Sequence, residues 1–493
     1  MMSVSPSVEE ITIRELLEAY QTGTTTVRAV VEEYLRRIEM LDRSGPSLNS
    51  IVAVSDSALA RADELDRELA ESGQLAGPLH GVVVAVKDNI DTVDMDTTCG
   101  SEALKGHRPE KDAVAVARLR DAGAVIIAKT TLPDFASSWF SYSSVSGETL
   151  NPHRLSHDPG GSSSGSAAAV AANLATVALG TDCGGSVRLP ASFCNLVGVR
   201  STPGVVPRTG TGFLVEFQDT VGPLARTVED AVAVFDVIAG YDEGDAFSVS
   251  ATMSRPPRGY QTSLGDRSIA GTRIGLVTNA LGDESDARCR EVNTLARRAA
   301  ADMRAAGAEV VEVEIPDLDT HLADTSQYVA CSRHDIDLYL TQRPTLSHLR
   351  VADIVESGRY HPELDLLEAV SAGPEDPESD PDYTGRYVAR DKFTRTILNV
   401  MERHDLDALT YPTTRVPAPS NDERQEWTVL TFPTNTLIAS QALLPSVTVP
   451  AGFTVDEVPV GVELVGRPHR EADLFRWAAG YERASQHRRA PEL

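Results

Sequence analysis

A helix–glycine–strand succession between residues 112 and 129 most constrains what this chain can fold into. Residues 112–122 have a helical pattern, Gly123 interrupts it, and the apolar run 124–129 (AVIIAK) follows as a predicted strand. Another apolar run, 82–86 (VVVAV), precedes the helix and is also a predicted strand. Strand, helix and strand in this order indicate parallel neighbouring strands. The chain is therefore expected to have an α/β fold.

Hydrophobic periodicity predicts further elements along the chain. In residues 24–42 apolar side chains recur at helical spacing, after threonines that can cap a helix. Two stretches rich in Pro, Asp, Ser and Gly, about 245–270 and 372–384, are expected to be variable loops of a single domain. The other predicted elements are helices at 56–71, 166–179 and 293–306, and strands at 272–277, 309–315 and 442–452.

Composition and charge exclude several classes of protein. The 493 residues carry a net charge of −27, which argues against binding to nucleic acid or to anionic membranes, because their phosphates would repel the chain. No apolar run reaches the roughly 18 residues of a membrane span, and the N-terminal residues lack the basic and apolar regions of a secretory signal. The five cysteines form no CxxC pair, so no disulfide framework is expected. We therefore expect a cytoplasmic protein without nucleic-acid or membrane partners.

Two serine–glycine segments are the strongest functional signal. Residues 160–170 have the sequence GGSSSGSAAAV and residues 180–190 the sequence GTDCGGSVRLP, so Ser162 and Ser186 are 24 positions apart. Two glycines before Ser186 let the backbone turn sharply and direct successive N–H groups to one point, as an oxyanion hole requires. The simpler interpretations are a Gly-Ser turn at Ser186 and a loop that caps the alanine-rich helix at Ser162.

A lysine inside an apolar run is unusual in this chain. Only five of the 45 basic residues are lysines, and Lys87 follows directly on the strand predicted at 82–86. Partial burial disfavours an ammonium group, lowers its pKa and lets the neutral amine act as a base. The alternative is a lysine at the strand end that reaches solvent or pairs with Asp88. The two serine segments favour the catalytic interpretation.

Two other kinds of site fit the sequence less well. A phosphate-binding loop at the first serine segment would need a following GK[ST], which is absent. A metal site at His153 and His157 would need a helix to bring both rings to one side, but they lie in a proline-containing loop. We therefore expect no metal and no cofactor.

The two serine segments and the lysine resemble the motifs of the amidase signature family, the Ser–cis-Ser–Lys hydrolases. The glycine–serine loop of the family is GGSSGGSA; here it is GGSSSGSA, with Ser164 in place of one glycine. The nucleophile segment of the family, GTD-x-GGS-x-R-x-P, is matched throughout from Gly180 to Pro190, and the offset between the serines is kept. The resemblance extends over roughly residues 10–485 through GPLHGVVVAVKDNID (77–91), LRDAGAVIIAKTTLPDFA (119–136), DTVGPLARTVEDAV (219–232) and LPSVTVPAG (444–452).

The resemblance implies a role for each matching residue. Lys87 resembles the general base, Ser162 the relay serine whose preceding peptide bond is cis, and Ser186 the nucleophile. The residues that match the oxyanion hole of the family, through their backbone N–H groups, are Cys183, Gly184, Gly185 and Ser186. The residues that match its supporting hydrogen bonds are Ser163, Asp182 and Arg188.

The resemblance also implies a fold and a reaction. The family fold is α/β, with a large central mixed β-sheet flanked by helices on both faces. We accordingly divide the chain into an N-terminal helical segment, residues 1–70, that packs on an amidase signature catalytic domain, residues 71–490. The expected reaction is hydrolysis of the C–N bond of a linear amide through an acyl-enzyme.

Leu189 and the region 386–400 bear on which branch of the family the chain resembles. In glutamine-dependent tRNA amidotransferases, the amidase component that supplies ammonia to its partner usually has Gln at the position of Leu189. Its C-terminal basic-aromatic motif is not visible in RYVARDKFTRTILNV (386–400). We therefore favour a free-standing hydrolase. A catalytically inactive binding homologue is disfavoured, because all three catalytic positions are present.

The expected substrate pocket is apolar and aromatic. Such a pocket favours amides with an apolar or aryl portion, and it agrees with ester or carbamate cleavage as in aryl acylamidase-type and urethanase-type members. The expected partners are this small-molecule substrate and, from the family, a second copy of the chain in a homodimer. The alternative is that the rings pack the core. The candidate pocket residues are Trp139, Phe140, Phe213, Leu214, Phe217 and Tyr328.

Overall fold

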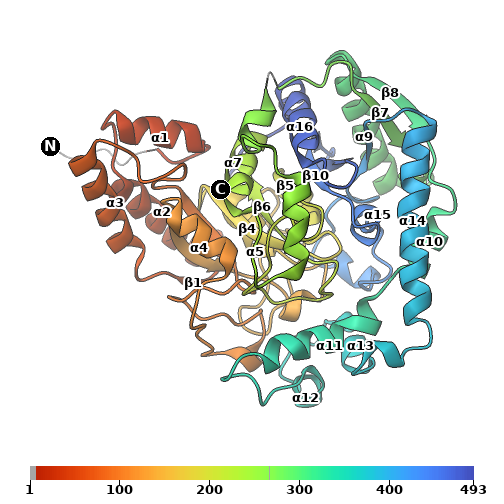
Figure 1. Ribbon diagram of the computed structural model, residues 1–493, viewed down its shortest axis with the longest axis horizontal. Coiled ribbons are helices and arrows are strands. Elements are labelled where there is room, and N and C mark those ends of the chain that lie inside the picture. The colour runs from red at the N-terminus through yellow and green to blue at the C-terminus, as the bar shows by residue number, and fades with distance from the viewer. Residues whose placement is uncertain (1–6, 266) are drawn as a thin grey trace.

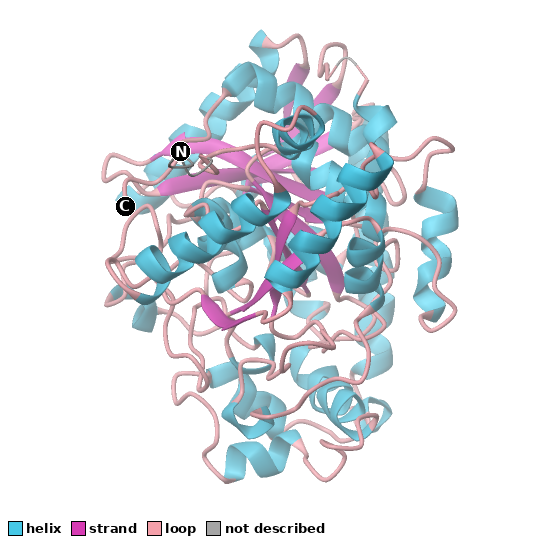
Figure 2. Ribbon diagram, turned by 90° about the vertical axis from the view of Figure 1, so that its left-hand side faces the viewer, coloured by secondary structure: helices cyan, strands magenta, loops and turns pink. Residues whose placement is uncertain are grey.

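A mixed sheet of 11 strands runs through the molecule, with helices against both of its faces (Figures 1 and 2). The computed structural model describes residues 7–265 and 267–493. Residues 1–6 of the expected N-terminal segment and residue 266 of the expected loop 245–270 lie outside the described residues. The strands are β1 (Ile51–Val54), β2 (Val83–Lys87), β3 (Val125–Thr130), β4 (Val177–Asp182), β5 (Val197–Arg200), β6 (Thr220–Ala225), β7 (Arg273–Val277), β8 (Glu309–Val313), β9 (Ala408–Pro412), β10 (Ser446–Phe453) and β11 (Pro459–Val465).

The strand order of the sheet is β1-β3-β2-β4-β6-β5-β10-β11-β9-β7-β8. β2 pairs in parallel with both β3 and β4, and β7 pairs in parallel with both β8 and β9. The antiparallel strands between these two groups make the sheet mixed. The parallel neighbours predicted from the order around Gly123 are thus confirmed as β2 and β3.

The helices surround this sheet along its whole length. They are α1 (Ile13–Gln21), α2 (Val27–Arg37), α3 (Ala58–Ser72), α4 (Val114–Asp121), α5 (Ser164–Ala171), α6 (Arg188–Phe193), α7 (Val228–Ile238), α8 (Ala251–Ser254), α9 (Ala287–Ala305), α10 (Leu318–Asp324), α11 (Tyr328–Thr341), α12 (Val351–Glu356), α13 (Asp365–Ser371), α14 (Tyr383–Arg403), α15 (Thr436–Gln441) and α16 (Glu471–Ser485). Within the described residues, no helix is long and apolar enough to cross a lipid bilayer.

Alternate side chains of β2 enter two separate apolar cores. Val84 and Val86 pack in a cluster with side chains of α4, α7, α9 and α16. Val83 and Ala85 point to the other face and pack with α2, α3 and α5. Since successive side chains of a strand point to opposite faces, a strand buried on both sides needs helices on both sides. The expected helical cover of both faces is confirmed.

A third apolar cluster lies beside the sheet, where α11, α12 and α13 gather at the bottom of Figure 1. It brings Trp139 and Phe140 together with side chains of α11 and α13. The stretch 372–384 that follows α13 is mostly irregular, with one short helical turn, Pro377–Ser379. The segment 1–70 contains α1, α2 and α3 and also strand β1, which pairs with β3 at one edge of the sheet.

Several predicted boundaries are wrong. The helix expected at 166–179 is α5, which ends at Ala171, and residues 177–179 belong to β4. Asn173, with a positive φ of 55°, lies where the chain turns, and its side chain accepts the N–H of Glu10. The helix expected at 24–42 continues past α2 as a π-helical turn, Ile38–Arg43. The remaining differences are α9, which begins six residues before position 293, and β10, which begins at Ser446 rather than at 442.

Candidate active site

The site is built at the end of two parallel strands. Lys87 is the last residue of β2 and is completely buried. Its Nζ atom lies 2.8 Å from Ser162 Oγ and 2.8 Å from Thr181 Oγ1. Thr181 stands near the end of β4, which runs parallel to β2. Since parallel strands end at the same edge of a sheet, the fold places both side chains at one point.

Burial sets the protonation state of Lys87. Removal from water lowers the pKa of its ammonium to about 7, and the carboxylates of Asp219 and Asp182 oppose this shift only in part. A lysine with this pKa is substantially neutral near pH 7 and can accept a proton. The hydrogen bond to Ser162 shows which group lies closest for that exchange.

The glycine–serine loop that precedes α5 carries Ser162. The peptide bond Gly161–Ser162 is cis, as the resemblance implies. Gly161 is packed so tightly that an added Cβ would lie 2.7 Å from the carbonyl oxygen of Ser138. The N–H of Ser163 donates to the carbonyl of Ser186 at 3.1 Å, so the backbone joins the two serine segments directly.

Residues 183–186 form a sharp turn between β4 and α6. Gly185 has a φ of 145°, and a Cβ there would lie 2.1 Å from Thr436 Oγ1. A Cβ on Gly184 would lie 2.0 Å from Tyr328 Oη. Within the described part of the chain, the backbone N–H groups of Gly184, Gly185 and Ser186 donate no hydrogen bond. Free N–H groups at a rigid turn beside a serine can stabilise an oxyanion.

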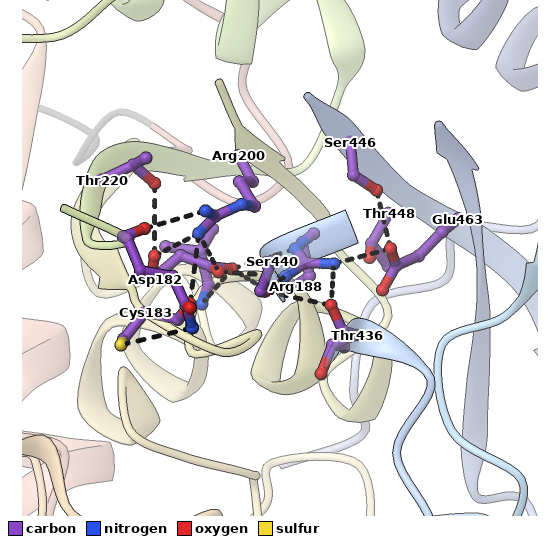
Figure 3. A network of polar contacts seen from close by, with 12 residues as sticks. Asp182, Cys183, Arg188, Arg200, Thr220, Thr436, Ser440, Ser446, Thr448 and Glu463 are labelled. Carbon is purple, nitrogen blue, oxygen red and sulfur yellow. Dashed lines mark hydrogen bonds and ion pairs between the residues drawn. The ribbon is translucent and has the colours of Figure 1, made fainter. Parts of the chain in front are cut away.

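A buried charge network holds this turn in place (Figure 3). Asp182 accepts from Arg188 Nε and Nη2, each at 3.0 Å, and from Arg200 Nη1 at 2.9 Å. The two guanidinium groups hold the pKa of the Asp182 carboxyl well below its usual range. Arg188 also donates to Glu463 Oε2 of β11 at 2.7 Å and to the carbonyl of Thr436 at 3.0 Å. The network therefore ties the turn after β4 to β11 and α15.

Ser186 lines a very narrow cavity that leads to a larger pocket. The free space at Ser186 is about 10 Å³, room for roughly one water. The adjoining pocket has about 640 Å³. Trp139, Tyr328 and Val429 line both spaces, so a group that reaches Ser186 from the larger pocket passes these three side chains.

The structure divides the six predicted pocket residues into two groups. Trp139, Leu214 and Tyr328 line the cavity at Ser186. The other three line neither space. Phe140 packs edge-on against Phe432 with 5.3 Å between ring centroids. Phe213 lies against the guanidinium of Arg208 at 5.4 Å, and Phe217 packs on Tyr387 at 5.1 Å.

Sequence reasoning missed three polar residues around Lys87. Thr181 accepts from Lys87 and from Asn89 Nδ2, the latter at 3.1 Å. Buried Asp219 accepts the N–H groups of Leu214 and Val215 at 2.8 and 3.0 Å, which fixes the loop that contributes Leu214 to the cavity. The signal was available for Thr181 and Asn89: one lies in GTD and the other two positions after Lys87.

Histidines contribute nothing to this site. Burial lowers the pKa of His153 to about 3, and its ring packs against Phe453. In the part of the chain that the structure describes, no group of three or more His, Cys, Asp or Glu side chains is arranged to hold a metal ion.

A buried lysine bonded to a serine, beside a glycine turn with free N–H groups, defines an amide-cleaving type of site. The chain belongs to the amidase family, the amidase signature enzymes: the family model described as Amidase matches residues 29–475.

Relatives with different activities cover nearly the whole chain. The A-type subunit of the glutamyl-tRNA(Gln) amidotransferase from Synechococcus sp. (strain JA-2-3B'a(2-13)) is 34% identical over 98% of this chain and 93% of its own length. The peptide amidase of Stenotrophomonas maltophilia has a TM-score of 0.86 and 35% identity over 98% of this chain and 99% of its own. A bacterial aryl acylamidase has a TM-score of 0.83 and 25% identity over 97% of both chains.

Proposed function

We propose that this protein is a free-standing amidohydrolase with Ser186 as nucleophile, Ser162 as proton relay and Lys87 as base. The observation that carries the proposal is the 2.8 Å contact between buried Lys87 Nζ and Ser162 Oγ, next to a turn with free N–H groups. Family membership supports C–N bond cleavage. The three residues need no cofactor for this reaction.

Acylation begins with two linked proton transfers. Neutral Lys87 takes the proton of Ser162, which takes the proton of Ser186 as Ser186 Oγ attacks the amide carbonyl. Ser186 Oγ has no hydrogen-bond partner within the described residues; catalytic hydrogen bonds are often long without substrate and tighten when it binds. The oxyanion is stabilised by the N–H groups of residues 183–186.

Breakdown of the tetrahedral intermediate completes the reaction. The C–N bond breaks, and the proton held by Lys87 returns through Ser162 to the departing amine. Water then attacks the ester on Ser186, with its proton accepted along the same relay, and the carboxylic acid leaves. Each proton that Lys87 accepts is released within one turnover, so the enzyme returns to its starting state.

The pocket supports a substrate with an extended apolar or aryl portion. Beyond the narrow cavity at Ser186, the larger pocket is lined by Trp139, Leu322, Val429, Leu430, Phe432 and Leu437 among others. A carbonyl fits the narrow end and the rest of the molecule fits the wide end. Apolar pockets discriminate weakly, by about 1–3 kcal/mol per methylene, so we propose tolerance of aryl amides, with esters and carbamates as further substrates.

Buried Tyr328 is proposed to contact the substrate directly. It is 4% exposed, and its hydroxyl has no hydrogen-bond partner within the described residues although it lies against Gly184. Burial keeps the pKa of this hydroxyl well above its usual value, so it remains protonated. A buried unpaired hydroxyl is costly, and an amide group at Ser186 offers it a partner.

The second candidate is an ammonia-supplying component of a tRNA amidotransferase. It is favoured by the 34% identity to the Synechococcus amidotransferase chain over 98% of this chain. Leu189, where that branch usually has Gln, favours the free-standing enzyme. Leu189 is completely buried and would lie 2.7 Å from a Cβ on Gly160, so it packs under the loop that carries Ser162.

A substrate panel separates the two candidates. The purified chain is assayed alone on free glutamine, an aliphatic amide, a 4-nitroanilide, a 4-nitrophenyl ester and an aryl carbamate. We expect turnover of the anilide and the ester without any partner. Preference for glutamine, or activity only with further subunits and charged tRNA, would contradict the free-standing hydrolase. Failure on the carbamate alone would remove only that substrate class.

A further inference from the structure

The charged residues of the 640 Å³ pocket are unevenly paired. Four of its lining residues are charged: Asp319, Asp380, Arg386 and Arg415. Arg415 Nη2 lies 3.4 Å from Asp319 Oδ1, so these two form an ion pair. Asp380 Oδ1 accepts the backbone N–H of Asp382 at 2.9 Å, in the turn before α14. Among the described residues, Arg386 is left without a carboxylate partner.

The guanidinium of Arg386 is held in place but not neutralised. Its Nη1 donates to the carbonyl of Ser326 at 2.9 Å, and its Nε is buried without a hydrogen-bond partner among the described residues. Neighbouring surface arginines do have acidic partners: Arg333 pairs with Glu375 at 2.7 Å, and Arg395 pairs with Asp391. The lack of a partner is therefore particular to the arginine that faces the pocket.

A second arginine makes the missing anion more conspicuous. Arg390 lies four residues after Arg386 on α14, where like charges repel each other. It packs over the rings of Phe217 and Tyr387 at 4.5 and 4.4 Å. Its Nη1 is the one terminal guanidinium nitrogen of the described residues that is buried without a partner. Both arginines also lie in the N-terminal half of α14, where the helix dipole favours negative charge.

We infer that the wide end of the pocket binds an anionic group of the substrate, and that Arg386 is its ligand. This inference rests on the proposed hydrolase, because the anion is placed by a carbonyl bound at Ser186. The narrow cavity joins the pocket through Trp139, Tyr328 and Val429, so the anion must be remote from the scissile bond. The preferred substrates are amides that carry a carboxylate several bonds away, such as monoamides of dicarboxylic acids.

Matched pairs of substrates test this inference. One series consists of 4-nitroanilides of dicarboxylic acids of increasing chain length, each as the free acid and as its methyl ester. A second series carries the carboxylate on the leaving aniline. We expect the wild-type enzyme to prefer the acid over its ester at one chain length. The preference should fall at least about tenfold in Arg386→Met, because a hydrogen bond to a charged group is worth about this factor.

Three controls distinguish recognition from damage. Arg386→Lys should restore part of the preference, since it keeps the charge. Arg395→Gln, on the same helix but paired with Asp391, should leave kcat/KM of both substrates unchanged. The preference should weaken as ionic strength rises. An equal kcat/KM for acid and ester in both series, or a preference that survives in folded Arg386→Met, would overturn the inference. Lack of turnover of every ester by the wild type would instead contradict the proposed function.

Discussion

At the scale of single residues, Lys87 shows how burial selects chemistry. Its side chain contacts two hydroxyl groups and no carboxylate within the described residues, so little offsets the cost of removing its charge from water. The result is a pKa of about 7 rather than the usual value for lysine. Asp219 and Asp182 limit the shift, and Asp182 is itself neutralised by Arg188 and Arg200.

The pH dependence of turnover follows from this pKa. Below about 7 Lys87 is protonated and cannot accept a proton, so kcat/KM should fall about tenfold per pH unit. Above about 7 the amine is neutral and the rate should level off. The measurement is the pH profile with a neutral 4-nitroanilide. In Lys87→Ala the residual activity should lack this limb; the same limb in the variant would assign the base elsewhere.

Thr181 should position the lone pair of Lys87. Its Oγ1 accepts one N–H of Lys87, which leaves the lone pair of the neutral amine directed to Ser162. Thr181→Val should lower kcat on the order of 100-fold, the cost of a misplaced reacting group, and should move the limb to lower pH because the charged form loses an acceptor. Thr181→Ser should keep both the rate and the limb. An unshifted limb in Thr181→Val would show a merely structural role.

The catalytic residues and their helpers differ in how far the sequence predicts them. Lys87, Ser162 and Ser186 stand in motifs whose spacing is local, and the structure brings them together. Phe140, Phe213 and Phe217 have the same apolar character as Trp139, but only tertiary packing decides which ring faces the cavity. Sequence patterns carry no information on that direction.

At the scale of elements, the turn after β4 depends on two glycines with no free space around them. Gly184→Ala should place a methyl group against Tyr328 and Trp139, which costs about 1–3 kcal/mol of stability through overpacking and displaces the N–H groups. We expect kcat to fall by roughly 100-fold or more, measured with the same anilide.

Gly385 offers a matched control for this substitution. It lies in α14, and an added Cβ would meet nothing within 4 Å. Gly385→Ala should leave kcat on the neutral anilide unchanged and raise stability by about 0.5–1 kcal/mol. Equal losses in both variants would contradict a specific role for the turn.

Element boundaries were harder to predict than element types. The run from Ser166 to Leu179 is apolar throughout, so its pattern does not separate a helix from a following buried strand. In the structure α5 ends at Ala171, Asn173 turns the chain, and β4 begins at Val177. Asn173 and the β-branched Thr176 and Val177 were the available signals. By contrast, Gly123 marked the end of α4 correctly, because there the pattern changes at a glycine.

At the scale of the whole molecule, one buried arginine joins distant parts of the sheet. Arg188 follows the nucleophile turn, and its ion pairs reach Asp182 of β4 and Glu463 of β11. In the strand order three strands, β6, β5 and β10, lie between β4 and β11. The network therefore crosses the middle of the sheet rather than following its hydrogen-bond ladder (Figure 3).

Arg188→Met should destabilise the whole protein. It leaves Glu463 buried without a cation, and loss of one partner of a buried ion pair costs about 3–5 kcal/mol. Thermal and denaturant unfolding should both show the loss. Arg395→Met, which breaks the exposed pair with Asp391, should cost less than about 1 kcal/mol. Similar losses in the two variants would contradict the importance given to the buried network.

The central claim is that Ser186 is the nucleophile and is activated through Ser162 and Lys87. The most direct test is a fluorophosphonate probe, with intact mass and peptide mapping as the readout. We predict a single adduct on Ser186, formed faster as the pH rises through about 7, and no adduct on folded Ser186→Ala. A folded wild-type protein that forms no adduct at Ser186, or an adduct that persists in Ser186→Ala, would contradict the account.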